Sequence, residues 1–304
     1  MLTCVIYLND LEKYFIELNG TPSELLSEQS VNELNVFIKL FVILYADDTV
    51  ILTDTKEGVQ NALNIFQSYC EIWKPEVNVN KTKVVIFSKG KIRLKYEFKL
   101  QNKTLEIVDS YSYLGLIFKY NGNFNETRKK LARQAQISLF SIYKSIYLQL
   151  KLFDAMVEPI LLYGSEIWDY ENIKIIEQVH LQFCKRILKV RTTTPNFMVY
   201  GELGRFPLEI EVKMRMVSYW NKLLQNEKLS NSIYRLLLSL KHNGVQTFKW
   251  LNHVESIFND SGLGYIFHSQ DSSDYTRIKL LLNQTLKDQF IQRRTSEMIN
   301  SSRG

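Results

Sequence analysis

The pattern of apolar residues changes once along the chain, near residue 121, and this change limits the available folds. Residues 1–120 alternate strand-like and helix-like segments, whereas residues 125–300 read as successive amphipathic helices with little period-two alternation. The turn-forming sequence Asn121-Gly122-Asn123 lies between them. We therefore expect an α+β fold in two parts that pack together, residues 1–120 and an all-helical part, residues 121–304.

The composition is typical of a folded protein outside membranes. Hydrophobic residues make up 45% and charged residues 23% of the 304 residues, which argues against disordered and fibrous classes. The longest strongly apolar stretch, around residues 41–46, is far shorter than the ~20 residues that span a bilayer. The start of the chain has no secretory signal pattern, so we expect an intracellular protein without a membrane segment. The widely spaced cysteines are expected to be buried thiols: Cys4, Cys70 and Cys184.

Positive charge is concentrated in residues 81–103. The whole chain has 38 basic and 32 acidic residues, whereas this segment has eight basic residues and one acid, a net charge of +7. Such a segment would attract a polyanion, because neutralised phosphates release counterions. A solvated strand face is an equally simple interpretation. The basic residues proposed here for contact with a nucleic-acid backbone are Lys89, Lys91, Arg93 and Lys95.

Several elements follow from periodicity. Apolar runs at residues 36–44 and 49–53 predict a hairpin, and residues 83–88 and 94–100 predict two further strands. One helix stripe, ending before Pro75, consists of Val59, Ala62, Leu63, Phe66, Cys70 and Trp73. Core stripes in the second part are Ile176, Val179, Phe183 and Ile187; Val212, Met216, Tyr219 and Leu223; and Ile278, Leu281, Leu282 and Leu286.

The tetrad Tyr45-Ala46-Asp47-Asp48 lies between the strands of the first predicted hairpin. Two adjacent carboxylates repel each other unless a cation meets them. Mg²⁺ is suited to this role, because it is held by one or two carboxylates and by phosphate oxygens and water. Metal-assisted phosphoryl transfer is one interpretation of the tetrad, and a solvated Asp-Asp turn is the other.

The context of the tetrad resembles the catalytic hairpin of reverse transcriptases of non-LTR (LINE-like) retrotransposons. Further stretches match in the same order: Asn80-Lys81-Thr82-Lys83 with Val84-Val85-Ile86-Phe87, then Tyr113-Leu114-Gly115 with Gly122 and Phe124, then residues 159–168 (PILLYGSEIW), the run around 180–185, residues 199–204 (VYGELG), and Tyr219-Trp220. The resemblance covers roughly residues 5–255. It implies a partial polymerase palm, an antiparallel sheet with a helix, followed by a helical thumb and C-terminal region.

The resemblance also implies an activity and roles for individual residues. It implies RNA-templated DNA synthesis with Mg²⁺, with Asp47 as the principal metal ligand and Asp48 as its neighbour. Tyr45 and Ala46 would shape the floor under the primer and nucleotide, and Lys81 would lie near the triphosphate. The primer grip would consist of Tyr113, Leu114 and Gly115. Basic residues of the thumb-like helix would contact the phosphates of an RNA template and DNA primer: Arg128, Lys129, Lys130 and Arg133.

One part of the family pattern has no match in these 304 residues. The family palm needs a carboxylate on an earlier strand, whereas Tyr7 to Leu11 resemble only the end of the segment that follows it. We therefore expect a truncated or degenerate RNA-directed DNA polymerase with little or no activity as this chain. There are two alternatives. The chain is either a non-catalytic nucleic-acid-binding remnant of a retroelement or an unselected genomic relic without a function.

Other catalytic and metal-binding patterns are not supported. His180 and Cys184 are four residues apart on an expected helix, but no second pair completes a zinc site. The sequence contains neither GxSxG nor a glycine-rich phosphate loop. Isolated histidines are expected to be structural or on the surface.

Overall fold

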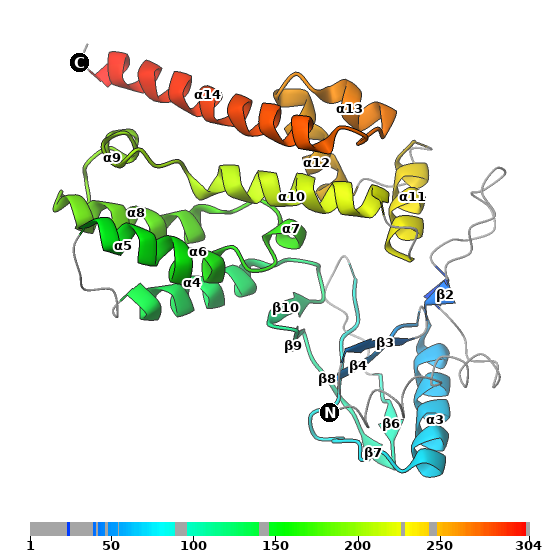
Figure 1. Ribbon diagram of the computed structural model, residues 1–304. Coiled ribbons are helices and arrows are strands. Elements are labelled where there is room, and N and C mark those ends of the chain that lie inside the picture. The colour runs from blue at the N-terminus through cyan, green and yellow to red at the C-terminus, as the bar shows by residue number, and fades with distance from the viewer. Residues whose placement is uncertain are drawn as a thin grey trace. The chain divides into compact units, whose positions relative to one another are not determined.

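The computed structural model describes residues 23–24, 39–40, 42–45, 48–53, 55–88, 96–139, 146–225, 229–242 and 248–301. The chain divides into two compact units, residues 1–123 and 124–304. The fold is α+β, with the described strands in the first unit and most helices in the second (Figure 1). That the units are a palm and a thumb stays a prediction. No helix in the described part of the chain is long and apolar enough to cross a membrane.

The described strands of the first unit form five two-stranded pairings. Four are antiparallel: β1 (Ser23–Glu24) with β2 (Lys39–Leu40), β3 (Val42–Tyr45) with β4 (Asp48–Ile51), β6 (Lys99–Leu100) with β7 (Lys103–Thr104), and β9 (Ser110–Tyr113) with β10 (Leu116–Lys119). The fifth, β5 (Lys83–Val84) with β8 (Glu106–Ile107), is parallel. This parallel pair is a departure from the antiparallel sheet that the sequence predicts.

Helix α3 (Lys56–Trp73) begins and ends where its sequence requires. Thr55 caps its first turn, because the side-chain oxygen accepts a hydrogen bond from Gly58 N at 3.0 Å. At the other end Lys74 adopts a left-handed conformation, and its N–H donates to Cys70 O. The following Pro75 disfavours helical backbone at the preceding residue. The predicted end of this helix is therefore confirmed.

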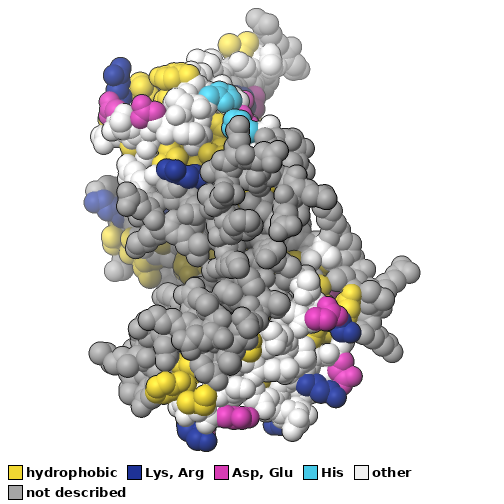
Figure 2. Space-filling view, turned by 90° about the vertical axis from the view of Figure 1, so that its right-hand side faces the viewer, with side chains coloured by type: hydrophobic (Ala, Val, Ile, Leu, Met, Phe, Trp, Pro, Cys, Tyr) yellow, Lys and Arg dark blue, Asp and Glu magenta, His cyan; other side chains and the backbone are white. Residues whose placement is uncertain are grey.

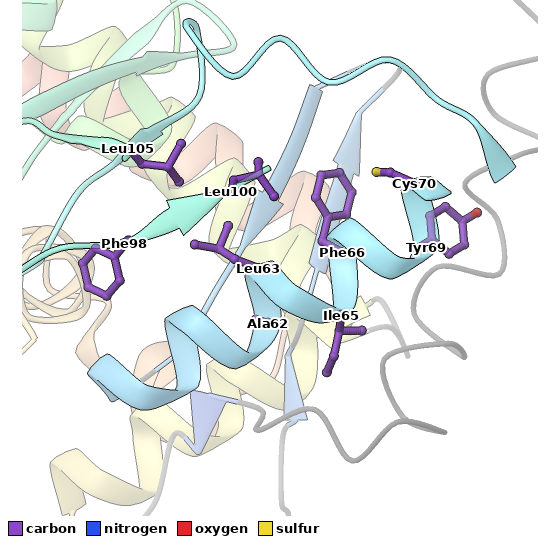
Figure 3. Close-up of a cluster of buried hydrophobic side chains, with 9 residues drawn as sticks. All are labelled: Ala62, Leu63, Ile65, Phe66, Tyr69, Cys70, Phe98, Leu100 and Leu105. Carbon is purple, nitrogen blue, oxygen red and sulfur yellow. The ribbon is translucent and has the colours of Figure 1, made fainter. Parts of the chain in front are cut away.

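The apolar face of α3 packs against the β6–β7 region. Leu63 and Phe66 lie toward Leu100 and Leu105 (Figure 3). The cluster consists of Ala62, Leu63, Ile65, Phe66, Tyr69, Cys70, Phe98, Leu100 and Leu105. Burial of such side chains, at ~25 cal/mol per Å² of apolar surface, holds the helix on the strands. The predicted stripe is wrong at Trp73, which is the last residue of α3 and is 43% exposed.

The predicted strand over residues 83–88 is only partly present. Strand pairing with β8 stops after Val84, and Phe87 is 59% exposed. By contrast, the alternation predicted around residue 98 is confirmed, because Phe98 and Leu100 are buried while Glu97 and Lys99 are exposed.

The second unit is built from helices, and α10 (Leu208–Gln225) lies at its centre. This helix contacts α7 (Ser165–Trp168), α8 (Lys174–Leu188), α11 (Leu229–His242), α12 (Lys249–Asp260) and α14 (Tyr275–Ser301). Figure 1 shows α10 between α14 and the group around α8. The remaining elements are α4 (Asn125–Leu139), α5 (Ile146–Leu152), the π-helical turn η2 (Phe153–Val157), α6 (Glu158–Leu161), α9 (Asn196–Leu203) and α13 (Gly264–Ser269).

The predicted core stripes of these helices are mostly buried. All four α8 positions are buried, and in α10 Tyr219 alone is half-buried. In α14 the prediction is wrong for Leu281, which is 44% exposed, because Ile278, Leu282 and Leu286 already fill the packing face. Helical spacing predicts the direction of a face but not its width.

Candidate active site

Asp48, the second aspartate of the tetrad, lies at the tip of the β3–β4 hairpin. The strands pair from Val42 opposite Ile51 to Tyr45 opposite Asp48, so two residues connect them. Asp48 is the first residue of β4 and its side chain is exposed. Ala46 and Asp47 lie outside the described residues, as does the side chain of Tyr45. The predicted hairpin is confirmed, and the backbone of Tyr45 and Asp48 flanks the two-residue turn.

Lys81 lies in a turn between α3 and β5. Its N–H donates to Asn78 O at 3.0 Å and also approaches Asn78 Oδ1 at 3.2 Å. The side chain is exposed. Two strand residues follow shortly after, of which Lys83 forms an ion pair with Glu106 at 2.7 Å. The part of the chain that the structure describes offers Lys81 no ion-pair partner, so its role at a triphosphate stays a prediction.

The predicted primer-grip residues form the tip of a second hairpin, β9–β10. Tyr113 pairs with Leu116 across the connecting residues Leu114 and Gly115. Both have positive φ, 47° for Leu114 and 83° for Gly115, as in a type I′ turn. Glycine adopts this conformation freely, whereas leucine does so at a cost of roughly 1–2 kcal/mol. Leu114 is also 38% exposed, so the tip presents an apolar side chain on strained backbone.

Comparison with known proteins identifies the segment that carries both hairpins. Residues 7–118 match a family described as reverse transcriptase (RNA-dependent DNA polymerase). The chain is also 25% identical over 165 residues to the RNA-directed DNA polymerase from mobile element jockey of Drosophila melanogaster. Residues 7–118 are therefore similar to reverse transcriptases, and the match to the jockey protein supports a non-LTR type. The alignment with the jockey protein takes in 50% of this chain and 18% of the relative, and no solved structure matches the chain.

Reverse transcriptases use divalent metal ions, and the donor chemistry of the β3–β4 tip fits them in part. An exposed carboxylate on Asp48 beside a second aspartate in the sequence is an oxygen donor set of the kind that Mg²⁺ prefers. The described residues contain no group of three His, Cys, Asp or Glu side chains that could hold a metal.

The basic residues proposed to contact a nucleic-acid backbone fall into two groups. Lys89, Lys91, Arg93 and Lys95 lie outside the described residues. On α4, Lys129 and Arg133 are exposed one turn apart, and Lys130 is partly buried. Arg128 is also on α4, but its side chain is only 4% exposed.

The structure gives Arg128 an internal role, which corrects the prediction of a phosphate contact. Its Nη1 donates to Asn125 Oδ1 at 2.9 Å, and its Nη2 donates to the carbonyl of Trp168. The guanidinium lies over the Trp168 ring, 5.0 Å from the centroid, and 3.8 Å from Asp169 Oδ1. Burial lowers the pKa of Arg128, and Asp169 and Glu171 oppose this change. Its side chain is thus used to join α4 to the segment after α7.

His180 and Cys184 lie in the interior of the helical unit. His180 is fully buried, with Nδ1 3.2 Å from Glu177 Oε1 and Nε2 accepting from Arg205 Nε at 3.0 Å. Burial raises the pKa of the Cys184 thiol to about 12, so the thiolate that zinc requires is disfavoured. The Glu177–His180–Arg205 cluster was not predicted from the sequence. Its one signal was the i, i+3 spacing of Glu177 and His180 on an otherwise apolar helix face.

Proposed function

We propose that residues 1–304 contribute to the active centre of an RNA-directed DNA polymerase of a non-LTR retrotransposon. The observation that carries this proposal is the β3–β4 hairpin, whose strands pair as far as Tyr45 and Asp48 within the segment that matches the reverse transcriptase family. In the sequence, Asp47 directly precedes Asp48. Asp47 is assigned as the principal metal ligand and Asp48 as its neighbour. The RNA template and DNA primer are the proposed partners.

The other residues act on the substrates. Bound Mg²⁺ would supply charge stabilisation to the attacking and leaving oxygens. The exposed ammonium group of Lys81 would bind the triphosphate of the incoming nucleotide. Tyr45 and Ala46 would support the primer end, and the tip formed by Tyr113, Leu114 and Gly115 would hold the primer strand against it. Gly115 suits this contact, because no side chain keeps the nucleic acid away from its backbone.

We further propose that these 304 residues alone synthesise DNA weakly or not at all. The family palm places an additional carboxylate on an earlier strand, and no residue of this chain matches it. Two-metal phosphoryl transfer depends on full electrostatic stabilisation of the transferred group, so an incomplete ligand set lowers the rate by orders of magnitude.

Primer extension tests the proposal. The purified chain is given a DNA primer on an RNA template with Mg²⁺ or Mn²⁺, beside the variants Asp47→Ala and Glu76→Ala, the latter replacing an exposed carboxylate outside the hairpin. We expect all three proteins to give equally little extension. Templated synthesis by the wild-type chain would overturn the proposal that the chain is inactive. If Asp47→Ala abolishes that synthesis and Glu76→Ala retains it, the result supports Asp47 as a metal ligand.

A metal titration tests the ligand assignment separately. Binding of Mn²⁺ is followed by water proton relaxation in the wild-type chain, in the double variant Asp47→Asn/Asp48→Asn, and in Glu76→Gln. We expect the double variant to lose the tightest binding and the control to keep it. Equal binding by all three proteins contradicts the assignment of Asp47 and Asp48 as metal ligands.

A further inference from the structure

The last turns of helix α14 contain a pair of arginines followed by two hydroxyl side chains. The sequence is Arg293-Arg294-Thr295-Ser296, and these are the only adjacent arginines in the chain. The side chains of Arg293, Thr295 and Ser296 are exposed, whereas Arg294 is partly buried. Two nucleophilic hydroxyl groups therefore lie on the surface directly after a double positive charge.

Acidic side chains do not neutralise this arginine pair. Arg293 and Arg294 form no ion pair with any residue that the structure describes, including Glu297, which lies one turn after Arg293. On the face drawn in Figure 2, by contrast, several Lys and Arg side chains lie beside Asp and Glu side chains. The arginine pair therefore keeps its charge available for an acidic partner surface.

The helix around the two hydroxyl groups is held only weakly. Thr295 Oγ1 donates to Ile291 O at 2.9 Å and Ser296 Oγ donates to Gln292 O at 3.0 Å, a pattern that slightly destabilises a helix. Residues 295–300 include threonine, serine and asparagine, which are poor helix formers, and their side chains are all exposed. Such a helix end unwinds at a low free-energy cost.

Just before these turns, α14 is docked on α9 and on the segment that follows it (Figure 1). The Phe290 ring packs on the rings of Tyr200 and Phe206, with centroids 5.9 and 5.8 Å away. The Arg294 guanidinium rests on Gly201, because a β-carbon at this glycine would lie 2.7 Å from Arg294 Nη1. Arg294 Nε is buried without a hydrogen-bond partner among the described residues, so this docked position is not fully satisfied.

We propose that Ser296 is a phosphorylation site for a serine/threonine kinase with an acidic peptide-binding cleft, and that docking of Arg294 on Gly201 limits access to it. Kinases select their substrates by the charges around the acceptor, and Arg293 and Arg294 lie three and two residues before Ser296. In the reaction, Ser296 Oγ attacks the γ-phosphorus of ATP, the hydroxyl proton passes to the catalytic base of the kinase, and ADP leaves.

Ser296 is favoured over Thr295 by its position on the helix. Arg293 lies three residues before Ser296 and therefore on the same side of α14, whereas Arg294 and Thr295 are adjacent in sequence and diverge. A phosphate on Ser296 adds about −1.5 to −2 charges and three acceptor oxygens one turn from the exposed Arg293 guanidinium. The product therefore gains a charge-assisted contact with Arg293.

Access to this site requires Arg294 to leave α9. An acidic cleft that binds both arginines needs the segment unwound, and the docked guanidinium of Arg294 opposes this change. The rate of phosphorylation then follows the population of the undocked form, because opening of a helix end is fast relative to phosphoryl transfer. Weaker docking of α14 on α9 should raise the rate.

Phosphate incorporation into the full chain tests the acceptor. The chain is incubated with ATP and either cyclic-AMP-dependent or calmodulin-dependent protein kinase, both of which have acidic clefts, and the modified residue is located by mass spectrometry. The variants are Ser296→Ala, Thr295→Ala, and Arg293→Gln/Arg294→Gln. The control Arg277→Gln/Lys279→Gln removes two exposed cations near the start of α14. Thermal unfolding verifies that each variant is folded.

We expect Ser296→Ala to abolish incorporation at this segment, and Thr295→Ala and the control to keep it. The arginine variant should lower kcat/KM by about 100-fold, close to tenfold for each lost charge-assisted contact. Absence of phosphate on Ser296 with both kinases overturns the site. Equal losses in the arginine variant and the control overturn recognition by the arginine pair.

Two further variants test the control of access without changing the acceptor sequence. Gly201→Ala displaces the Arg294 guanidinium, and Phe290→Ala weakens the packing of α14 on Tyr200 and Phe206. We expect each to raise kcat/KM for Ser296 by about three- to tenfold, since more of the chain is undocked. An unchanged or lower value in both folded variants overturns the role of the docked Arg294.

Discussion

Glu177 collects three hydrogen-bond donors around one carboxylate inside the helical unit. Its Oε1 accepts from the Tyr200 hydroxyl and from His180 Nδ1, and its Oε2 accepts from Leu208 N at 2.8 Å. Because Nε2 of His180 accepts from Arg205, the His180 proton lies on Nδ1. Arg205 continues the network to Asp154 and Glu158. Burial, with Glu177 beside it, raises the pKa of Tyr200 far above its ordinary value, so this hydroxyl remains a donor.

Replacing Glu177 removes the acceptor that this network needs. We expect Glu177→Ala to lower the free energy of unfolding by about 3 kcal/mol, because the Tyr200 hydroxyl and Leu208 N are left buried without a partner. Urea denaturation measures the loss. The control is Glu202→Ala on an exposed position of α9, with an expected change within about 0.5 kcal/mol. Similar losses in the two variants would show that Glu177 is an ordinary surface acid.

The β9–β10 hairpin is the element whose local sequence disagrees most with its conformation. A type I′ turn favours asparagine followed by glycine, and here leucine occupies the first position at φ 47°. Strained residues of this kind persist where the surrounding structure or a ligand contact requires them. Leu114 therefore supports the proposed contact between this tip and the primer strand.

Substitutions at the two positions of this turn are expected to change the free energy of unfolding in opposite directions. We expect Leu114→Asn to raise the free energy of unfolding by about 0.5 to 1 kcal/mol, because asparagine tolerates positive φ. Gly115→Ala should lower it by about 1 kcal/mol, because alanine at φ 83° is strained. Thermal unfolding measures both. A destabilising Leu114→Asn would mean that the leucine side chain contributes more by packing than its backbone costs.

At the scale of the whole molecule, the net charge of a folded unit differs in sign from the net charge of a short segment within it. Residues 81–103 carry +7, yet the unit that contains them has a net charge of −2, because acids outnumber bases among its other residues. The excess of positive charge belongs to the helical unit, at +8. A polyanion responds to the charge on the surface of a folded unit. The charge of residues 81–103 therefore predicts binding at that segment, whereas the charge of the two units predicts binding at the helical unit.

A fragment distinguishes these two expectations. We expect residues 124–304 expressed alone to unfold cooperatively, because the unit has its own core around α10, and to retain the salt-dependence of hybrid binding within about one unit of slope. Circular dichroism and anisotropy measure the two properties. A folded fragment that has lost the binding would place the electrostatic contact in residues 81–103 and not on Lys129 and Arg133 of α4.

Local patterns predicted the helices and the hairpin because their causes are local. The α8 stripe follows from a 3.6-residue repeat, and the strands around residues 45–48 follow from short apolar runs. The same patterns wrongly predicted that Trp73, Leu281 and Phe87 are buried. The exposure of these side chains depends on which other elements pack against them. Proximity in three dimensions has no counterpart in a one-dimensional repeat.

The amino-acid sequence by itself determined the resemblance to reverse transcriptases, the order of elements and the β3–β4 hairpin, because motif spacing and periodicity are properties of neighbouring residues. Only the tertiary structure decided the role of Arg128. The sequence does not distinguish the four basic residues that lie within six positions of α4. In the helix, Arg128 points inward onto Trp168, whereas Lys129 and Arg133 are exposed. The same packing brought α8 beside α4, where Arg186 Nη2 donates to the carbonyl of Leu139 at 3.5 Å.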